Sequence, residues 1–260
     1  MSRASAVPLR HVEFCMGTAF SIDVRLPGVD SAALGEVVDW LHRVDETFST
    51  YRPDSQISRL GRGELAVTDC APEVREVLRR CAELEAETDG YFSAYASGAL
   101  DPSGYVKGWT IEQASELLIA AGSRNHCVNG GGDVQCAGSA GSDQPWRIGI
   151  ADPRNRDQLV GVAIGAGIAV ATSGSAERGS HIVDPHDRSL PTGLLSVSVI
   201  GRRLSVVDAY ATAAFAMGAG AFGWLSGLPG LDALIVQADG AVCSTAGAQL
   251  LHGQPSSTTV

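Results

Sequence analysis

Several patterns that would assign a class to this sequence are absent. Its six cysteines form no C-x-x-C pair, and no group of cysteine and histidine has the spacing of a zinc site. The first eleven residues contain no apolar run of the length that a signal peptide needs. We therefore expect a cytoplasmic protein whose thiols are reduced.

Positive charge is also scarce. The 260 residues include 19 Lys and Arg against 29 Asp and Glu, a formal charge of −10, and no run is rich in Lys or Arg. Such a chain cannot neutralise many phosphates along a nucleic acid, so we expect no nucleic-acid partner. Apolar residues make up 45% and charged residues 18%, a balance that favours a substantial core and argues against global disorder.

One stretch, residues 209–231, lacks charged residues over a length that could span a membrane. It is rich in Ala and Gly, however, contains Thr212 and Pro229, and is interrupted at Gly218 and Gly220. These features favour a buried helix followed by a turn.

Hydrophobic periodicity predicts helices and short strands. Helical spacing is found at 31–42, 72–88, 110–121 and 207–217. Strands are expected at 12–26 (a pair or one bent strand), 127–129, 133–137, 146–150, 160–170, 195–201, 234–237 and 241–243. Thr110 and Gln113 have the spacing of a capping box for the third helix. Because helices and strands alternate without a regular βαβ rhythm, an α+β fold is favoured.

Two short motifs could carry chemistry or only structure. The consecutive glycines of the segment 129–133 (NGGGD) would let backbone amides approach an anion, although a tight hairpin explains them as well. Asp208 and Thr212 are four residues apart and so share one face of an apolar helix. Their oxygens suit Mg²⁺, but Asp208 could equally be a carboxylate near a helix N-terminus.

Three polar segments add further candidates. The segment 171–185 holds His181 among hydroxyl and charged side chains, which suits acid–base chemistry near neutral pH or simply a surface loop. The segments 47–60, with Tyr51, and 89–109, with Tyr91, could each be an ordinary loop.

Six motifs, taken in order, resemble those of the ApbE family, flavin transferases that use FAD to attach FMN to a protein. They are MGT at 16–18, FSTYRPDS with ISRL at 48–60, DPSGYVKGW at 101–109, NGGGDV at 129–134, TSG with HIVDP at 172–185, and DAYATA at 208–213. Any one of these motifs is weak, but six in the same order are specific.

The resemblance implies a role for each matching position. Two side chains would line the flavin, namely Met16 and Tyr51. Contacts to FAD would come from Tyr91, Phe92, Ser93, Asp101, Lys107 and Ile182. A Mg²⁺ ion would be held against the pyrophosphate by a backbone oxygen near Gly104 together with Asp208 and Thr212. The candidate general base is His181.

The resemblance also implies a fold and an activity. The fold would be one α+β domain of two intertwined subdomains with mixed or antiparallel sheets, over residues 11–252, between an N-terminal arm (1–10) and a flexible tail (253–260). The activity would be Mg²⁺-dependent transfer of FMN from FAD to a Thr or Ser hydroxyl of a partner flavoprotein, such as a membrane or redox protein, with release of AMP.

Some positions depart from the family pattern. Ser93 stands where the family has an aspartate beside the flavin, and the chain reaches Asp101 soon after Gly90, without a longer insertion. The segment 101–104 reads DPSG in place of D-L-G-G, and no export signal or lipoprotein cysteine is seen. Two alternatives therefore stay open: an FAD pyrophosphatase that yields FMN and AMP, and a non-catalytic flavin-binding protein.

Overall fold

The computed structural model describes residues 8–25, 29–141, 144–175 and 182–245. They form the predicted α+β fold, built on an eight-stranded sheet in the order β1-β2-β3-β4-β7-β8-β9-β10 and a separate two-stranded sheet, β5-β6. Neighbouring strands are antiparallel throughout both sheets. The predicted tail, 253–260, lies outside the described residues.

The elements have the following bounds. The strands are β1 (Leu9–Cys15), β2 (Thr18–Val24), β3 (His126–Gly130), β4 (Asp133–Ala137), β5 (Trp146–Asp152), β6 (Asn155–Gly165), β7 (Ala169–Gly174), β8 (Leu194–Gly201), β9 (Asp232–Gln237) and β10 (Val242–Ser244). The helices are α1 (Ser31–Phe48), α2 (Gln56–Gly61), α3 (Pro72–Glu87), α4 (Ser103–Ala120), α6 (Leu204–Met217) and α7 (Ala221–Ser226), with 3₁₀ turns η1 (Val67–Asp69) and η2 (Gly218–Gly220).

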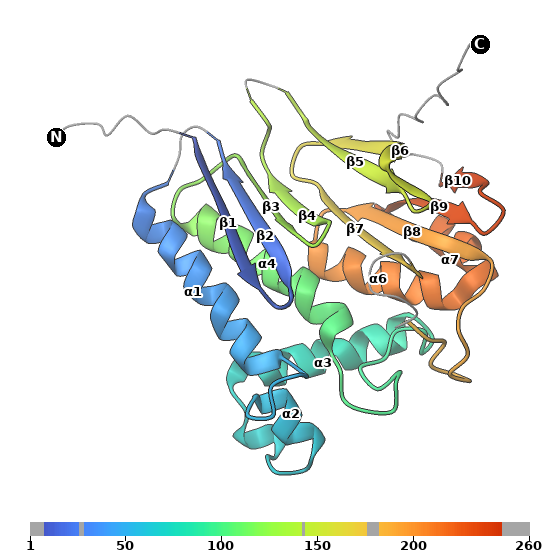
Figure 1. Cartoon of the computed structure of the whole chain (residues 1–260), viewed down its shortest axis with the longest axis horizontal. Helices are drawn as coiled ribbons and strands as arrows, with labels where there is room; N and C mark the ends of the chain where they lie inside the picture. Colours follow the sequence, from blue (N-terminus) through green and yellow to red (C-terminus); the bar gives the residue numbers. More distant parts are fainter. Residues whose placement is uncertain (1–7, 26–28, 142–143, 176–181, 246–260) are drawn as a thin grey trace.

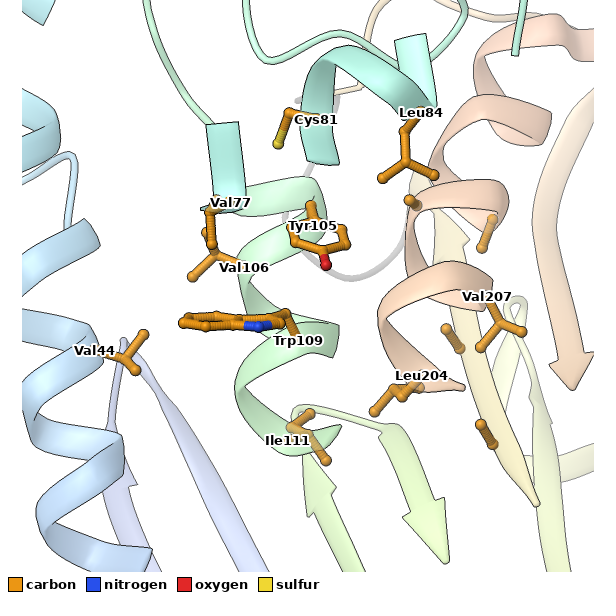
Figure 2. Close-up of a cluster of buried hydrophobic side chains, with 14 of the residues drawn as sticks. Val44, Val77, Cys81, Leu84, Tyr105, Val106, Trp109, Ile111, Leu204 and Val207 are labelled. Atoms are coloured by element: carbon orange, nitrogen blue, oxygen red, sulfur yellow. The ribbon is translucent and has the colours of Figure 1, made fainter. Parts of the chain in front are cut away.

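Helices cover one face of the large sheet (Figure 1). Helices α1 and α4 lie beside β1 to β4, and α6 and α7 lie beside β7 to β9. Helix α4 is the centre of this layer, because its side chains meet those of α1, α3 and α6 (Figure 2). The Trp109 ring packs edge-on against Trp40 and Phe48, and the Trp40 indole N–H donates to the Thr110 carbonyl at 3.0 Å. Buried aromatic contacts of this kind fix α1 on α4.

The β5-β6 ribbon packs against part of the other face. A second apolar cluster joins Trp146 and Ile150 of the ribbon to Val134, Val170 and Leu234 of the large sheet. Side chains alternate across a strand, so β7 serves both cores: Val170 faces the ribbon while its neighbours Ala169 and Ala171 face the helices.

Helices α4 and α6 approach each other closely at Gly108. A Cβ atom on Gly108 would lie 2.7 Å from the Leu204 carbonyl oxygen and 2.7 Å from the Asp208 Cβ, closer than real Cβ contacts allow. The Gly108 N–H donates to Asp208 Oδ2 at 2.9 Å. Glycine is therefore required here, and the close approach brings the preceding residue, Lys107, towards Asp208.

Two of the predicted elements differ from those observed. The third helix begins at Ser103, well before Thr110, whose hydroxyl donates to the Val106 carbonyl from inside the helix and caps nothing. The strand expected at 160–170 is two strands, β6 and β7, because the chain turns at Gly167, where φ is +57°. The other expected helices and strands are present with shifted ends, and β1 begins at Leu9, inside the predicted arm.

The uncharged stretch forms α6, η2 and α7, as the prediction of a buried helix followed by a turn requires. The run Leu204–Ser226 is long and apolar enough to cross a membrane, but 67% of its most apolar window is buried inside the fold. Burial against the sheet explains its composition, since a helix that is apolar on every side is typical of a protein core.

Candidate functional site

A polar cavity of about 150 Å³ lies between α4, α6 and the end of β7. Nine of the predicted site residues line it: Tyr91, Phe92, Ser93, Asp101, Gly104, Lys107, Ile182, Asp208 and Thr212. These residues are far apart in the sequence and are brought together only by the packing of α4 on α6. His181 lies outside the described residues, next to Ile182.

Three charged side chains meet at the wall of this cavity. The Lys107 ammonium lies 2.5 Å from Asp133 Oδ2 and 3.8 Å from Asp208 Oδ1. The Asp133 and Asp208 side chains are 1% and 3% exposed and that of Lys107 is 19% exposed, so the cation sits between two buried carboxylates. Removing Lys107 from this cluster would leave the buried carboxylates without a compensating charge.

Sequence reasoning missed Asp133 as a site residue. It follows the glycine hairpin at the start of β4, and its Oδ1 accepts the Thr172 N–H at 3.0 Å, which ties the hairpin to β7. The hairpin interpretation of NGGGD is confirmed, because Gly131 and Gly132 have φ of +62° and +100° and connect β3 to β4. Its position at the end of the NGGGD motif is the feature of the sequence that could have identified Asp133 as a site residue.

The Asp208–Thr212 face of α6 points at α4 and β7. The Thr212 hydroxyl lies 3.4 Å from the Ser173 hydroxyl, and a Cβ on Gly104 would stand 3.7 Å from the Thr212 oxygen. A carboxylate, two hydroxyls and the α4 main chain therefore converge within one buried wall. Hard divalent cations take oxygen ligands of these kinds.

This donor set fits a cation that keeps other ligands. Among the residues that the structure describes, no group of three or more His, Cys, Asp or Glu side chains gathers as a metal cluster. An ion at Asp208 and Thr212 would therefore complete its shell with water and ligand oxygens, which is how Mg²⁺ is usually bound next to phosphates.

A second cavity, of about 270 Å³, lies beside the turn between β1 and β2. Its wall is largely apolar and aromatic and includes Met16, Phe20, Phe48 and Tyr51. Met16 is held in the turn at φ +52°, and Tyr51 is 96% exposed, so its ring stands free at the cavity edge. The predicted pair of Met16 and Tyr51 thus belongs to one cavity, separate from the polar one.

The two cavities share part of helix α4. Ser103 and Lys107 line both cavities. Val106 lines only the apolar cavity, and Gly104 lines only the polar one. One extended ligand could therefore lie across this first part of α4, with an apolar planar group at one end and an anionic group at the other.

Comparisons with known proteins show which family the chain resembles. The model of the ApbE family matches residues 16–98 and 94–235, a range that includes both cavities. The chain is 32% identical to the FAD:protein FMN transferase of Rhodobacter capsulatus over 198 residues, which are 73% of this chain and 35% of that protein. It thus spans about a third of the length of that relative.

Two further proteins cover most of the chain. The FAD:protein FMN transferase of Vibrio cholerae is 28% identical over 265 residues, 78% of this chain and 79% of that protein. The crystal structure of the ApbE protein of Thermotoga maritima superposes with a TM-score of 0.81 at 21% identity, covering 92% of this chain and 97% of that one. The likeness to the Thermotoga maritima structure establishes that the two proteins have the same fold.

Proposed function

The chain belongs to the ApbE family, and from this membership we propose that it is an FAD:protein FMN transferase, an enzyme of protein flavinylation. The named activity of its relatives in Rhodobacter capsulatus and Vibrio cholerae supports the proposal. The observation that carries it is the pair of cavities joined at Lys107, because they offer separate surroundings to the two unlike halves of a dinucleotide.

In this proposal FAD lies across the start of α4. The isoalloxazine ring packs between Met16 and Tyr51, which supply a polarizable and an aromatic surface. The pyrophosphate lies beside Lys107, the cation that lines both cavities. The adenylate half occupies the polar cavity, against Tyr91 and Ile182. Ser93 lines this cavity too, so in this proposal it lies beside the adenylate half and not beside the flavin, where the family resemblance puts position 93.

A magnesium ion is the cofactor that the polar wall fits. Asp208, Thr212 and the Gly104 main chain would hold it, and when bound it would neutralise charge that develops on the pyrophosphate. The chain's own contribution is to position these oxygens: Gly108 donates its N–H to Asp208 Oδ2 and so orients the carboxylate.

The proposed chemistry exchanges one phosphorus–oxygen bond for another. The hydroxyl oxygen of a Thr or Ser on the partner protein bonds to the FMN-side phosphorus, the pyrophosphate bond breaks, and AMP leaves with the bonding electron pair. The hydroxyl proton passes to His181 as general base, which requires a neutral imidazole. The role of His181 is supported by its motif, since the residue lies outside the described part of the chain.

Mass spectrometry of the reaction products tests the proposal. Purified protein is mixed with FAD, Mg²⁺ and a flavoprotein that carries a Thr or Ser acceptor, and the acceptor is examined for added FMN. We expect an FMN adduct and free AMP, and we expect His181→Ala to lose rate by about 10²-fold or more while FAD affinity hardly changes. Free FMN with no adduct would instead identify an FAD pyrophosphatase, and tight FAD binding without turnover a flavin-binding protein.

A further inference from the structure

A tight turn at 184–189 directly follows two residues that line the polar cavity. The Asp184 N–H donates to the Ser189 carbonyl at 2.9 Å, and the Arg188 N–H donates to the Asp184 carbonyl at 2.7 Å. Ile182 and Val183, which come just before this turn, line the cavity. The turn is therefore a compact support for one wall of the proposed FAD site.

His186 connects this turn to the segment that follows α3, which lines the same cavity. Its Nδ1 lies 2.8 Å from Asp184 Oδ1, and its Nε2 lies 3.0 Å from the carbonyl oxygen of Asp89, in the segment that follows α3. Its ring packs edge-on against Tyr91, with the ring centres 4.5 Å apart. A Cβ on Gly90 would stand 3.3 Å from Nε2, so the main chain comes close to the imidazole here.

Both ring nitrogens of His186 face atoms that can only accept hydrogen bonds. An ionised carboxylate has no proton to give, and neither has a backbone carbonyl. A neutral imidazole carries a single N–H and can satisfy only one of these two acceptors, whereas an imidazolium donates to both. Only the protonated ring can therefore donate to both acceptors at once.

We propose that His186 is a positioning residue that, when protonated, fastens the segment 89–92 to the turn at 184–189 and so holds Tyr91 in place against FAD. The proposal rests on the proposed function, because it assumes that the polar cavity binds FAD. His186 lies outside the residues that line the cavity, so it acts through Tyr91 and Asp89.

The residues around Tyr91 explain why one contact matters. On its C-terminal side the segment is already anchored, because the Phe92 N–H donates to the Thr88 hydroxyl at 3.0 Å and the Phe92 ring is buried against Gly104. Tyr91 lies between this anchor and the Asp89 carbonyl that His186 holds. The Gly90 and Tyr91 N–H groups also donate to the Glu85 and Thr88 carbonyls, at 2.8 and 3.1 Å, so the main chain stays attached to α3 without His186. Loss of the His186 contact therefore frees the Tyr91 ring, against which the imidazole packs.

The charges around His186 set the direction of the pH dependence. Asp184 and Asp187 face it from its own turn, and Asp89 and Tyr91 face it from the segment after α3. The pKa of His186 is raised above its ordinary value, mainly because the Asp184 carboxylate accepts its N–H. The two hydrogen bonds from the His186 ring are therefore both present at pH values below the ordinary histidine pKa of about 6.5. One of them is lost as the pH rises through the raised pKa of His186.

Titration of FAD against three forms of the protein tests the proposal. FAD affinity is measured by flavin fluorescence between about pH 5.5 and 8.5 for the wild type, His186→Ala and His186→Arg. Arginine stays charged and can donate to both acceptors, so it is the matched control that retains the donors without titrating. Thermal unfolding of each form shows whether the variants remain folded.

We expect the FAD affinity of the wild type to fall about three- to tenfold as the pH rises across this range, because one charge-assisted hydrogen bond in a partly exposed site is lost. His186→Ala should bind weakly at every pH, and His186→Arg should bind as tightly at the high end as the wild type does at the low end. The same pH profile in all three proteins would overturn the proposal.

A measurement without FAD separates this proposal from the proposed function. ¹⁵N NMR of the histidine rings in ligand-free protein, followed as the pH is raised, should show that both nitrogens of His186 stay protonated to a higher pH than those of an ordinary exposed histidine. If NMR shows the expected protonation of His186 but FAD does not bind, the proposed function is wrong and the contact made by His186 is confirmed. If FAD binds but His186 titrates as an ordinary exposed histidine, the fastening is wrong and the proposed function is unaffected.

Discussion

The two cavities that meet at Lys107 are built in opposite ways. The polar cavity has buried charge at its wall: Asp208 lines it, Asp133 lies behind it beside Lys107, and both carboxylates are almost wholly inaccessible. Each of them accepts a backbone N–H. The apolar cavity opens at the surface, where the ring of Tyr51 is 96% exposed and little fixes it.

This difference has a physical reason. A site that stabilises charge works best when its dipoles and charges are preorganised, because no reorganisation is then required at the moment of reaction. A flat apolar ring gains most of its binding energy from area removed from water, which a mobile aromatic side chain can supply as it closes over the ligand. We therefore expect the polar cavity to govern turnover and the apolar cavity to govern which dinucleotide binds.

Asp208 gives the largest expected effect. Asp208→Asn keeps an oxygen that can accept the Gly108 N–H but removes the charge, so we expect activity to fall about 10²- to 10³-fold or more with the unfolding temperature nearly unchanged. Asp39→Asn, the same change on the exposed face of α1, is the control. Full activity of Asp208→Asn at saturating Mg²⁺ would remove this aspartate from the proposed metal site.

Lys107 tests the junction between the cavities. Lys107→Met leaves the buried Asp133 carboxylate without its ammonium partner, and we expect it to lower the free energy of unfolding by about 3 kcal/mol, measured by urea denaturation, and to weaken FAD binding. The double variant Lys107→Met/Asp133→Asn should recover part of the stability but none of the FAD affinity. Equal recovery of both would mean that Lys107 is purely structural.

Tyr51 should have the smallest effect and the most selective one. Because its side chain is exposed, Tyr51→Ala should leave stability unchanged while lowering FAD affinity about three- to tenfold and leaving ADP affinity as it is. Tyr95→Ala removes another exposed tyrosine that lines neither cavity and serves as the control. A parallel loss of ADP affinity would place Tyr51 outside the flavin site.

The sequence predicted best what depends on local spacing. Asp208 and Thr212 are one helical turn apart, so their common face follows from helix geometry alone. The meeting of Lys107 with Asp133 and Asp208 could not be derived in this way, because it depends on how α4 crosses α6. The motifs of the family supplied Lys107 and Asp208 as site residues, but not their ion pairs.

The start of α4 shows why some elements were misjudged. The segment 101–109 contains Pro102, Gly104 and Gly108, residues of low helix propensity that favour a loop. In the structure Asp101 accepts the Ser103 N–H at 3.0 Å where the helix begins, and Gly108 permits the close crossing with α6. Tertiary packing therefore overrides propensity at the residues that the site needs.

Competition experiments with the two halves of FAD test most directly whether each cavity binds one half. Riboflavin and ADP are each titrated against FAD, and riboflavin is then titrated in the presence of saturating ADP. If one dinucleotide spans the two cavities, each fragment displaces FAD, yet riboflavin binds with the same affinity whether or not ADP is present. Displacement of riboflavin by ADP, or failure of either fragment to displace FAD, would contradict the assignment of the two cavities to the two halves.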